Sequence, residues 1–198
     1  MAKVTLDEIQ KLRTRTSMGM MDCKKALQES EGDMEKAVEL LRKKGAKVAA
    51  KRGDNVTDQG LVYSYIHPGS TVGVLVELNC ETDFVARNKA LSELAQDLGM
   101  HIAAMKPLYL NPESVDKVWL EKEKVLIKEQ LIEEGKKAEF VDKIVEGKVN
   151  KIYSDVCLLQ QKFVKNDKFT IEQIVQDVVG KMGENIKIRR FVRYEVGV

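Results

Sequence analysis

The chain has 198 residues, of which 43% are hydrophobic and 32% are charged, and its formal net charge is +2. This length suits one ordinary domain with a small appendage, and the hydrophobic content is sufficient for a packed core. No run of about 18 apolar residues occurs, which excludes a membrane-spanning helix. The N-terminus has no apolar signal-peptide core, so we expect a cytoplasmic protein.

The cysteines do not form a recognisable framework. Cys23, Cys80 and Cys157 are widely spaced, without a C-x-x-C pair, and the chain has only two histidines. Zinc sites and disulfide scaffolds need closer or more numerous ligands than these. We therefore expect free, buried thiols and no metal site.

Basic residues are concentrated toward the start of the chain. Residues 1–53 hold 13 Lys and Arg against 8 Asp and Glu, a net charge of +5, whereas the remainder carries −3. Strong binding to phosphates usually needs a denser basic cluster with interleaved aromatic residues, and this segment has no aromatic residue. We therefore expect no nucleic-acid partner and favour an acidic protein surface. An RNA-binding factor that uses this segment is the alternative.

A small domain of three short helices is predicted over residues 1–45. Thr5 and Glu8 form a capping box at the start of the first helix, and Gly45 is the predicted end of the third. Three helices of this length form only a small core, so the domain is marginal alone. Residues 46–59 lose the apolar stripe and are predicted to be a linker.

The predicted loop between the first two helices is unusual. Met18-Gly19-Met20-Met21 places methionines where a turn is ordinarily polar. These side chains either pack inward or form an adaptable contact surface, because methionine is flexible and polarisable. The residues alone leave both interpretations open.

A β-hairpin is predicted from Gly60 onward. Side chains alternate along 61–67, Pro68-Gly69-Ser70 turns the chain, and 72–78 follows as a mostly apolar run with several β-branched residues. A single hairpin is not stable alone, so a third strand must cover it. The predicted third strand is 186–196, at the far end of the chain.

Helices are predicted between these strands. One covers 91–102, and a longer one starts at Asn111-Pro112, where the missing proline N–H costs nothing. It breaks at Gly135 before a second amphipathic helix, which predicts an antiparallel helical hairpin. A last helix is predicted from Thr170 to Val179. Residues 60–198 thus form an α+β core in which a three-stranded antiparallel sheet packs on helices.

No catalytic constellation is found. The chain has no G-x-x-x-x-G-K-[ST] or G-x-G-x-x-G loop for nucleotide phosphates, no G-x-S-x-G and no histidine-based metal motif. We therefore expect neither a cofactor nor direct nucleotide binding, and an enzyme is the least favoured class. We interpret His67, beside a turn, as structural. Gly180-Lys181-Met182-Gly183 is interpreted as a helix end with an oddly placed methionine.

One segment stands out at the corner between the strongest strand and the next helix. Thr82 or Asp83 is a suitable N-cap there, and Phe84 is then a hydrophobic staple that packs into the core. The other interpretation is an aromatic tip beside a carboxylate on a rigid turn, a shape suited to another protein's groove. The residues alone favour the first interpretation without excluding the second.

Several segments in order along the chain resemble the elongation factor Ts family, the guanine-nucleotide exchange factors of elongation factor Tu in bacterial and organellar translation. The segment Thr82-Asp83-Phe84-Val85-Ala86-Arg87-Asn88 resembles the family's core signature. Residues 18–27, Met-Gly-Met-Met-Asp-Cys-Lys-Lys-Ala-Leu, resemble its N-terminal signature. Segments 157–164 and 188–197 resemble its C-terminal half.

The resemblance implies binding to elongation factor Tu rather than catalysis. It implies a ubiquitin-associated-like N-terminal domain that docks on the partner's G domain. Asp83 and Phe84 would form a wedge near the magnesium side of the nucleotide pocket, with Thr82 as their cap. The partner contacts implied by the family's motifs are Arg13, Met20, Met21, Lys24, His67, Thr82, Asp83, Phe84, Val85, Val164, Met182 and Gly183.

The chain departs from the family pattern in two ways. Thr16-Ser17 stands where the family usually has Thr-Gly. The chain carries one core copy, whereas longer members carry two related copies and a C-terminal helical extension. The resemblance therefore leaves open that two copies pair as a homodimer.

Overall fold

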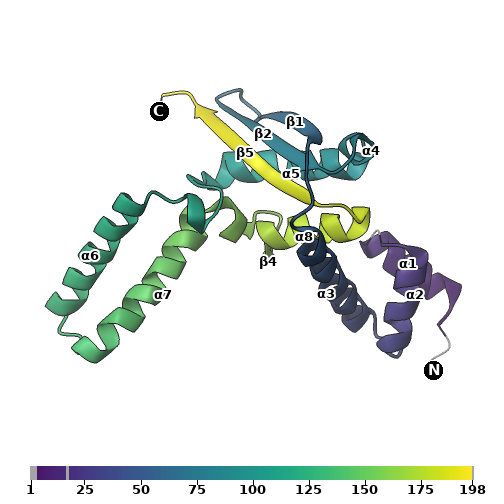
Figure 1. Ribbon diagram of the computed structural model, residues 1–198, viewed down its shortest axis with the longest axis horizontal. Coiled ribbons are helices and arrows are strands. Elements are labelled where there is room, and N and C mark those ends of the chain that lie inside the picture. Colours follow the sequence, from purple (N-terminus) through teal and green to yellow (C-terminus); the bar gives the residue numbers. More distant parts are fainter. Residues whose placement is uncertain (1–3, 17, 198) are drawn as a thin grey trace. The chain divides into compact units, whose positions relative to one another are not determined.

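A computed structural model of the chain describes residues 4–16 and 18–197 (Figure 1). The helices and strands follow one another as α1 (Leu6–Thr16), α2 (Met20–Glu29), α3 (Met34–Arg52), β1 (Gln59–Ile66), β2 (Val72–Cys80), α4 (Asp83–Ala86), α5 (Lys89–Met105), α6 (Lys117–Glu133), α7 (Ala138–Val156), β3 (Lys162–Phe163), β4 (Asn166–Thr170), α8 (Ile171–Met182) and β5 (Ile186–Glu195). Two short 3-10 turns lie at Pro112–Ser114 and Leu158–Gln160.

The predicted α+β class is confirmed. Three helices come first, and β1, β2 and β5 form a three-stranded antiparallel sheet in the order β1-β2-β5. The strand predicted from the far end of the chain is therefore paired with the hairpin, beside β2. Helices α6 and α7 pack on each other as the predicted helical hairpin (Figure 1).

The chain divides into two compact units. The first contains residues 1–63, 77–96 and 173–189, and the second contains 64–76, 97–172 and 190–198. The first unit therefore holds the three N-terminal helices, the end of β2, α4 and most of α8. The second holds the turn of the β1-β2 hairpin, most of α5, the α6–α7 hairpin and the β3-β4 hairpin.

The N-terminal helices enclose a small apolar core of their own. Ile9, Leu12, Cys23, Leu27 and Leu41 are among its buried residues. The predicted capping box is present at the start of α1. The Thr5 N–H donates to the Glu8 carboxylate at 2.8 Å, and the Glu8 N–H donates to the Thr5 hydroxyl at 3.3 Å. These bonds satisfy backbone donors that the first helical turn leaves without partners.

Helix α3 does not end at Gly45, so this part of the prediction was wrong. The helix continues to Arg52 and includes residues 46–52, which we expected in a linker. Gly45 is buried against α8, where a Cβ at Gly180 would lie 2.6 Å from the Gly45 Cα. The missing side chain of Gly180 thus lets the two helix backbones touch, and Arg42 adds an ion pair to Asp177 at 3.4 Å. Glycine serves here as a packing contact rather than as a helix end.

Two other helix boundaries differ from the prediction. Asn111-Pro112 starts only a 3-10 turn, because the Asn111 side chain and Ser114 cap each other and Val115 is extended. Helix α6 begins later, where the Asp116 carboxylate accepts from the Trp119 N–H at 2.7 Å. Helix α8 runs to Met182, beyond the predicted end at Val179.

The α6–α7 hairpin buries two small apolar clusters. Val115, Leu120, Val149 and Cys157 form one, and Ile127, Leu131 and Val141 form the other. The antiparallel β3-β4 pair follows the hairpin and was not predicted. In the described part of the chain, no helix is both long and apolar enough to cross a membrane.

We expect Gly180→Ala to lower the free energy of unfolding by about 1–3 kcal/mol, the usual cost of overpacking, because the new methyl group would meet the Gly45 backbone. Urea unfolding followed by circular dichroism measures this. Gly45→Ala is the matched control, because its nearest non-local atoms would lie 3.5 Å away and alanine favours helices. Equal stability of Gly180→Ala and the unchanged chain would contradict close helix contact.

Candidate functional site

The corner after β2 is a short, capped helix. Strand β2 ends at Cys80, and α4 covers only Asp83–Ala86. Thr82 is its N-cap, with a hydroxyl that accepts from the Val85 N–H at 3.4 Å. The Cys80 thiol donates to the Thr82 carbonyl at 3.2 Å. Burial, followed by the nearby Glu184 carboxylate, raises the pKa of the Cys80 thiol, which therefore stays neutral beneath the turn.

Phe84 does not pack into the core, so the staple interpretation was wrong. Its side chain is 83% exposed, whereas Val85 beside it is only 8% exposed and faces inward. Asp83 is half-exposed and forms an ion pair with Arg87 at 3.3 Å. The corner therefore presents an aromatic ring and a carboxylate to solvent, while Val85 anchors the turn from inside.

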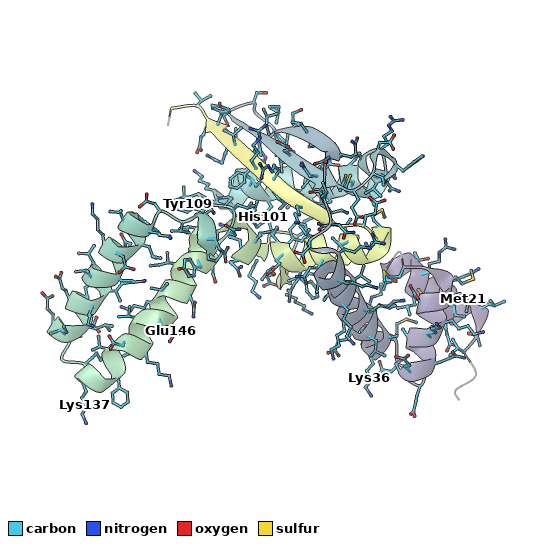
Figure 2. The ribbon with its side chains drawn as sticks, in the orientation of Figure 1. Met21, Lys36, His101, Tyr109, Lys137 and Glu146 are labelled. Atoms are coloured by element: carbon cyan, nitrogen blue, oxygen red, sulfur yellow. The ribbon has the colours of Figure 1, made fainter. Side chains whose placement is uncertain are left out.

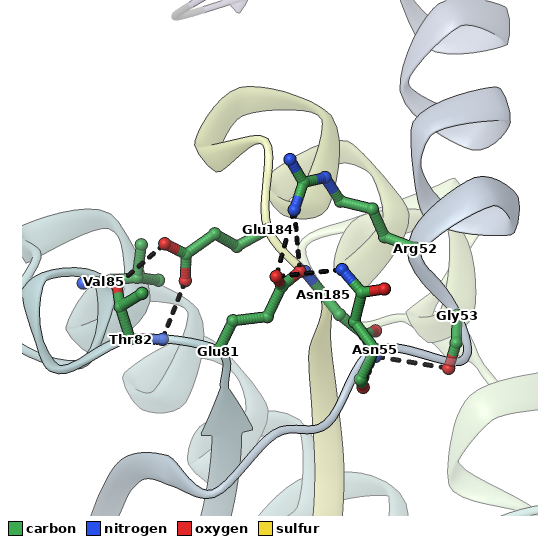
Figure 3. A network of polar contacts seen from close by, with 8 residues as sticks. All are labelled: Arg52, Gly53, Asn55, Glu81, Thr82, Val85, Glu184 and Asn185. Atoms are coloured by element: carbon green, nitrogen blue, oxygen red, sulfur yellow. Dashed lines mark hydrogen bonds and ion pairs between the residues drawn. The ribbon is translucent and has the colours of Figure 1, made fainter.

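Glu184 holds this corner from a distant part of the sequence. Its carboxylate accepts from the Thr82 N–H at 3.1 Å and from the Thr82 hydroxyl at 2.8 Å (Figure 3). The Thr82 hydroxyl thus donates to Glu184 while it accepts from Val85, which uses both of its hydrogen-bonding roles. Hydrogen bonds to a carboxylate acceptor are charge-assisted, and such bonds are shorter and stronger than neutral ones.

Glu81 forms a second anchor beside the first. Its carboxylate accepts from Arg52 at 3.0 and 3.1 Å, from the Asn55 amide at 3.0 Å and from the Asn185 N–H at 2.5 Å (Figure 3). The Asn185 N–H is the main cause that lowers the pKa of Glu81, and the Asn55 and Arg52 side chains add to it. The buried Asn185 amide donates to the backbone oxygens of Gly53 and Asn55.

Met182 and Gly183 directly precede Glu184, the residue that binds Thr82 at the corner. Helix α8 ends at Met182, and Gly183 turns the chain with a φ of +70°, a conformation that glycine adopts without strain. Glu184 follows at once and binds Thr82. The structure thus brings Thr82, Asp83, Phe84, Met182 and Gly183 into one supported region of the first unit.

The sequence did not reveal the residues that support this region. Glu81, Glu184 and Asn185 are ordinary polar residues beside strand or helix ends, and Glu184 lies 102 positions from Thr82. No periodicity or motif spacing connects two such segments. The only available signal was their position next to two segments that resemble family signatures.

The N-terminal candidate residues lie on the surface of the three-helix part. Arg13, Met20, Met21 and Lys24 are exposed, with Met20 at 44% and Met21 at 62%. Met21 lies on the outside of these helices (Figure 2). Met18 is buried, so the loop divides its methionines between core and surface. Of the unusual pair Thr16-Ser17, Thr16 ends α1 and Ser17 lies outside the described residues.

His67 and Val164 belong to the second unit. His67 is exposed at the end of the β1-β2 hairpin, where its Nδ1 lies 3.1 Å from the Tyr65 hydroxyl. Val164 is 45% exposed between β3 and β4. Its N–H donates to Nδ1 of His101 at 3.3 Å, so a buried histidine supports the turn that presents Val164.

His101 is fully buried and its polar atoms have partners. Because Nδ1 accepts from the Val164 N–H, Nε2 carries the proton. It donates to the side-chain oxygen of Gln161 at 3.0 Å. The Gln161 amide in turn donates to the backbone oxygen of Asp155 at 2.6 Å. Burial lowers the pKa of His101, and the neutral ring suits both bonds. Figure 2 labels this residue.

The cysteines are as predicted, since Cys23, Cys80 and Cys157 are free and buried. Among residues 4–16 and 18–197, no three His, Cys, Asp or Glu side chains are grouped so that they could hold a metal ion. The candidate site consists of the exposed Phe84 ring, the exposed Met20 and Met21 side chains and the Asp83 carboxylate, and Glu81 and Glu184 support the corner from behind.

Comparison with known proteins gives one family. The family model described as "Elongation factor TS" matches residues 6–198. A protein named elongation factor Ts from Desulforamulus reducens is 49% identical over 197 residues, which cover 100% of this chain and 91% of the relative. The proteins of the same name from Syntrophus aciditrophicus and Heliobacterium modesticaldum are 48% and 50% identical over 194 residues. These alignments cover 98% of this chain and 96% and 90% of the relatives.

We expect Glu184→Ala to speed amide hydrogen exchange at Thr82 and Val85 by about tenfold or more, because the Thr82 N–H loses its acceptor and its hydroxyl loses its orientation. Glu184→Gln should give a smaller increase, since its amide oxygen can still accept. Exchange followed by NMR or mass spectrometry measures both. Glu172→Ala, an exposed acid-to-alanine change in α8, is the control. Unchanged exchange in Glu184→Ala would show that the corner is rigid without Glu184.

We expect the buried His101 to make the chain less stable in mild acid. Because the folded pKa is lowered, the unfolded chain binds a proton first as the pH falls below about 6.5, and this favours unfolding. The loss is at most about 1.4 kcal/mol per pH unit. The measurement is the difference in unfolding free energy between the unchanged chain and His101→Gln from pH 7.5 to 5. A difference that stays constant with pH would contradict a buried neutral His101.

Proposed function

Because the chain belongs to the elongation factor Ts family, and so to the factors of translation elongation, we propose that it promotes GDP release from elongation factor Tu. In this proposal the chain acts by binding and performs no bond-making chemistry. It holds no nucleotide of its own, and its partner is the GDP form of elongation factor Tu.

The 83% exposure of Phe84 on a supported corner is the observation that carries the proposal. Burying a phenylalanine side chain is ordinarily favourable by about 1.5–3 kcal/mol, so a sequence that keeps one in solvent leaves that free energy for a partner. The anchors at Thr82 and Glu81 hold the backbone before binding. Such preorganisation reduces the entropy lost when the partner is engaged.

The physical basis of exchange lies in how a GTPase holds GDP. It grips the phosphates with a loop and with a magnesium ion that demands a near-ideal octahedral shell. In the proposal, Asp83 and Phe84 enter beside this shell and displace it, which weakens the hold on the β-phosphate. Because coupling is reciprocal, a factor that lowers GDP affinity is itself bound less tightly by the GDP form. It therefore stabilises the nucleotide-free state until GTP binds.

The exposed N-terminal residues supply a second contact in this proposal. Met20 and Met21 offer flexible apolar surface, and Arg13 and Lys24 offer positive charge to an acidic face of the partner. Further proposed contacts are Met182 and Gly183 in the first unit and His67 and Val164 in the second. In this arrangement, the residues of the docking domain determine the affinity for the partner, and the wedge residues determine the rate of nucleotide exchange.

An RNA-binding function finds less support in the arrangement of charges. Lys11, Arg15 and Lys44 in the basic front segment form ion pairs with Asp7, Glu35 and Asp22 of the same segment. Carboxylates interleaved in this way reduce the local positive potential, whereas phosphate binding needs a concentrated one.

We expect Phe84→Ala to lower the stimulated rate of GDP release from elongation factor Tu by at least about tenfold, as for a hot-spot side chain. The assay mixes a labelled-GDP complex of elongation factor Tu with a substoichiometric amount of the chain and excess unlabelled nucleotide. Phe140→Ala is the matched control, because Phe140 is also exposed, at 53%, but lies on α7. Its stimulation should be unchanged.

The two variants separate the outcomes. If the unchanged chain does not speed GDP release, the exchange function is wrong. If it does and a folded Phe84→Ala protein is equally active, exchange stands but Phe84 is not the wedge. RNA binding that weakens steeply with salt, without any effect on nucleotide release, would favour the alternative function.

A further inference from the structure

Glu81 joins the end of helix α3 to the corner. Arg52, the last residue of α3, donates to the Glu81 carboxylate at 3.0 and 3.1 Å, and Thr82 follows Glu81 directly (Figure 3). The Arg52 and Glu81 side chains are 40% and 18% exposed, so this pair is screened less than an open surface pair. The Asn185 N–H and the Asn55 amide donate to the same carboxylate. One carboxylate thus connects the end of α3 with the end of β2 and the start of β5.

The segment between α3 and β1 is held by the same group of side chains. No residue between these two elements is buried, so apolar packing does not fix them. The Asn185 amide donates to the backbone oxygens of Gly53 at 3.3 Å and Asn55 at 2.9 Å. The Lys187 ammonium also donates to the Gly53 oxygen, at 2.6 Å. Polar contacts therefore fix the path by which the chain passes from α3 to the sheet.

Helix α3 has another contact within the first unit, where Gly45 meets Gly180 of α8. Two helix backbones that touch at one point can still rotate about it. The ion pair of Arg42 with Asp177 lies less than one turn from Gly45 and gives little leverage against such a rotation. Arg52 lies seven residues beyond Gly45, about 10 Å along the helix. A bond at that distance prevents α3, and the N-terminal helices packed on it, from swinging about the glycine contact.

Stiffness at this joint matters because the proposed function uses two contacts on one partner. The N-terminal helices dock at one place, and the wedge displaces the magnesium shell at another. Binding free energy from a remote contact can drive a distortion at the reacting centre. It does so only when the two contacts keep a fixed spacing. If α3 swings, the helices dock while the wedge stops short of the shell.

We propose that Arg52 and Glu81 are positioning residues for nucleotide release, which transmit the docking of the N-terminal helices to the wedge at Asp83 and Phe84. The inference rests on the proposed exchange function. Neither side chain contacts the nucleotide or its magnesium ion in this arrangement. Their loss therefore reduces coupling rather than docking: the chain still binds its partner, but its binding weakens GDP affinity less.

Arg52→Ala tests the coupling, because it removes the bond to α3 and leaves Glu81 bonded to Asn185. Titrations of elongation factor Tu in its nucleotide-free form and in its GDP form give two dissociation constants for the chain. Their ratio equals the factor by which the chain weakens GDP binding, and it should fall by about fivefold or more. The maximal rate of stimulated GDP release should fall as well. A merely destabilised chain would weaken both affinities equally and leave the ratio unchanged.

Matched variants identify the bond that is responsible. Arg52→Lys keeps a cation beside Glu81 and should restore most of the ratio. Lys51→Ala removes an exposed basic residue from the same turn of α3 and is the control, with no change expected. Glu81→Gln should act in the same direction as Arg52→Ala. The double variant should be no worse than the more severe single one, because both changes act through one bond.

Spin labels test the joint without the partner. Labels at Lys25→Cys on α2 and at Phe84→Cys on the tip report the spacing between the docking helices and the wedge, and the natural cysteines are buried. Electron paramagnetic resonance measures the distribution of this distance. Arg52→Ala should broaden the distribution, whereas Lys51→Ala should not.

The remaining outcomes also decide the matter. Either an unchanged distance distribution or an unchanged ratio of dissociation constants in Arg52→Ala overturns the proposal, and in an exchange-active chain it refutes the positioning role alone. An equal effect of Lys51→Ala also overturns it, because net charge would then be responsible. If the unchanged chain does not speed GDP release, the exchange function fails and the positioning role fails with it. The spin labels then show only whether Arg52 and Glu81 hold α3 in place.

Discussion

Two carboxylates, Glu81 and Glu184, hold a short turn whose most prominent side chain faces water. Helix α4 has only four residues, which is too short to be stable by itself. An exposed aromatic residue adds no core packing that could fix it. The order of the corner therefore depends on the hydrogen bonds that Thr82 makes to Glu184 and on the bonds that Glu81 makes to Arg52 and Asn185. Rigidity here comes from these polar contacts behind the turn, together with the buried Val85 side chain.

The same contacts tie the corner to the N-terminal helices. Arg52 is the last residue of α3, and α3 also meets α8 where Gly45 and Gly180 touch. Because α3 is one continuous helix, the residues that would dock on a partner and the residues that would act on its nucleotide belong to one connected framework. A flexible linker at residues 46–52 would have let the docking residues and the wedge residues move independently, whereas the continuous helix couples their positions.

Sequence reasoning succeeded where the signal is local or periodic. Alternation gave the hairpin and the third strand, and the capping box at Thr5 gave the start of α1. It failed where tertiary contact overrides local preference. Gly45 is a residue type that commonly ends helices, but here it packs against Gly180 and α3 continues through it. The position of Phe84 beside a helix N-cap is typical of a hydrophobic staple, but its side chain faces solvent. The residues alone singled out the corner and the family resemblance favoured its interpretation as a partner contact, while its support by Glu184 could only come from the fold.

The long sequence separation within the corner affects how the protein is made. The Thr82 N–H and hydroxyl donate to Glu184, a residue that is synthesised 102 positions later. A growing chain that has just completed β2 and α4 already carries Phe84 but lacks the carboxylate that fixes it. The tip acquires its final geometry only after α8 and the turn at Gly183 have formed. Incomplete chains therefore carry a poorly shaped tip, and competence for binding arises late, when nearly the whole protein has folded.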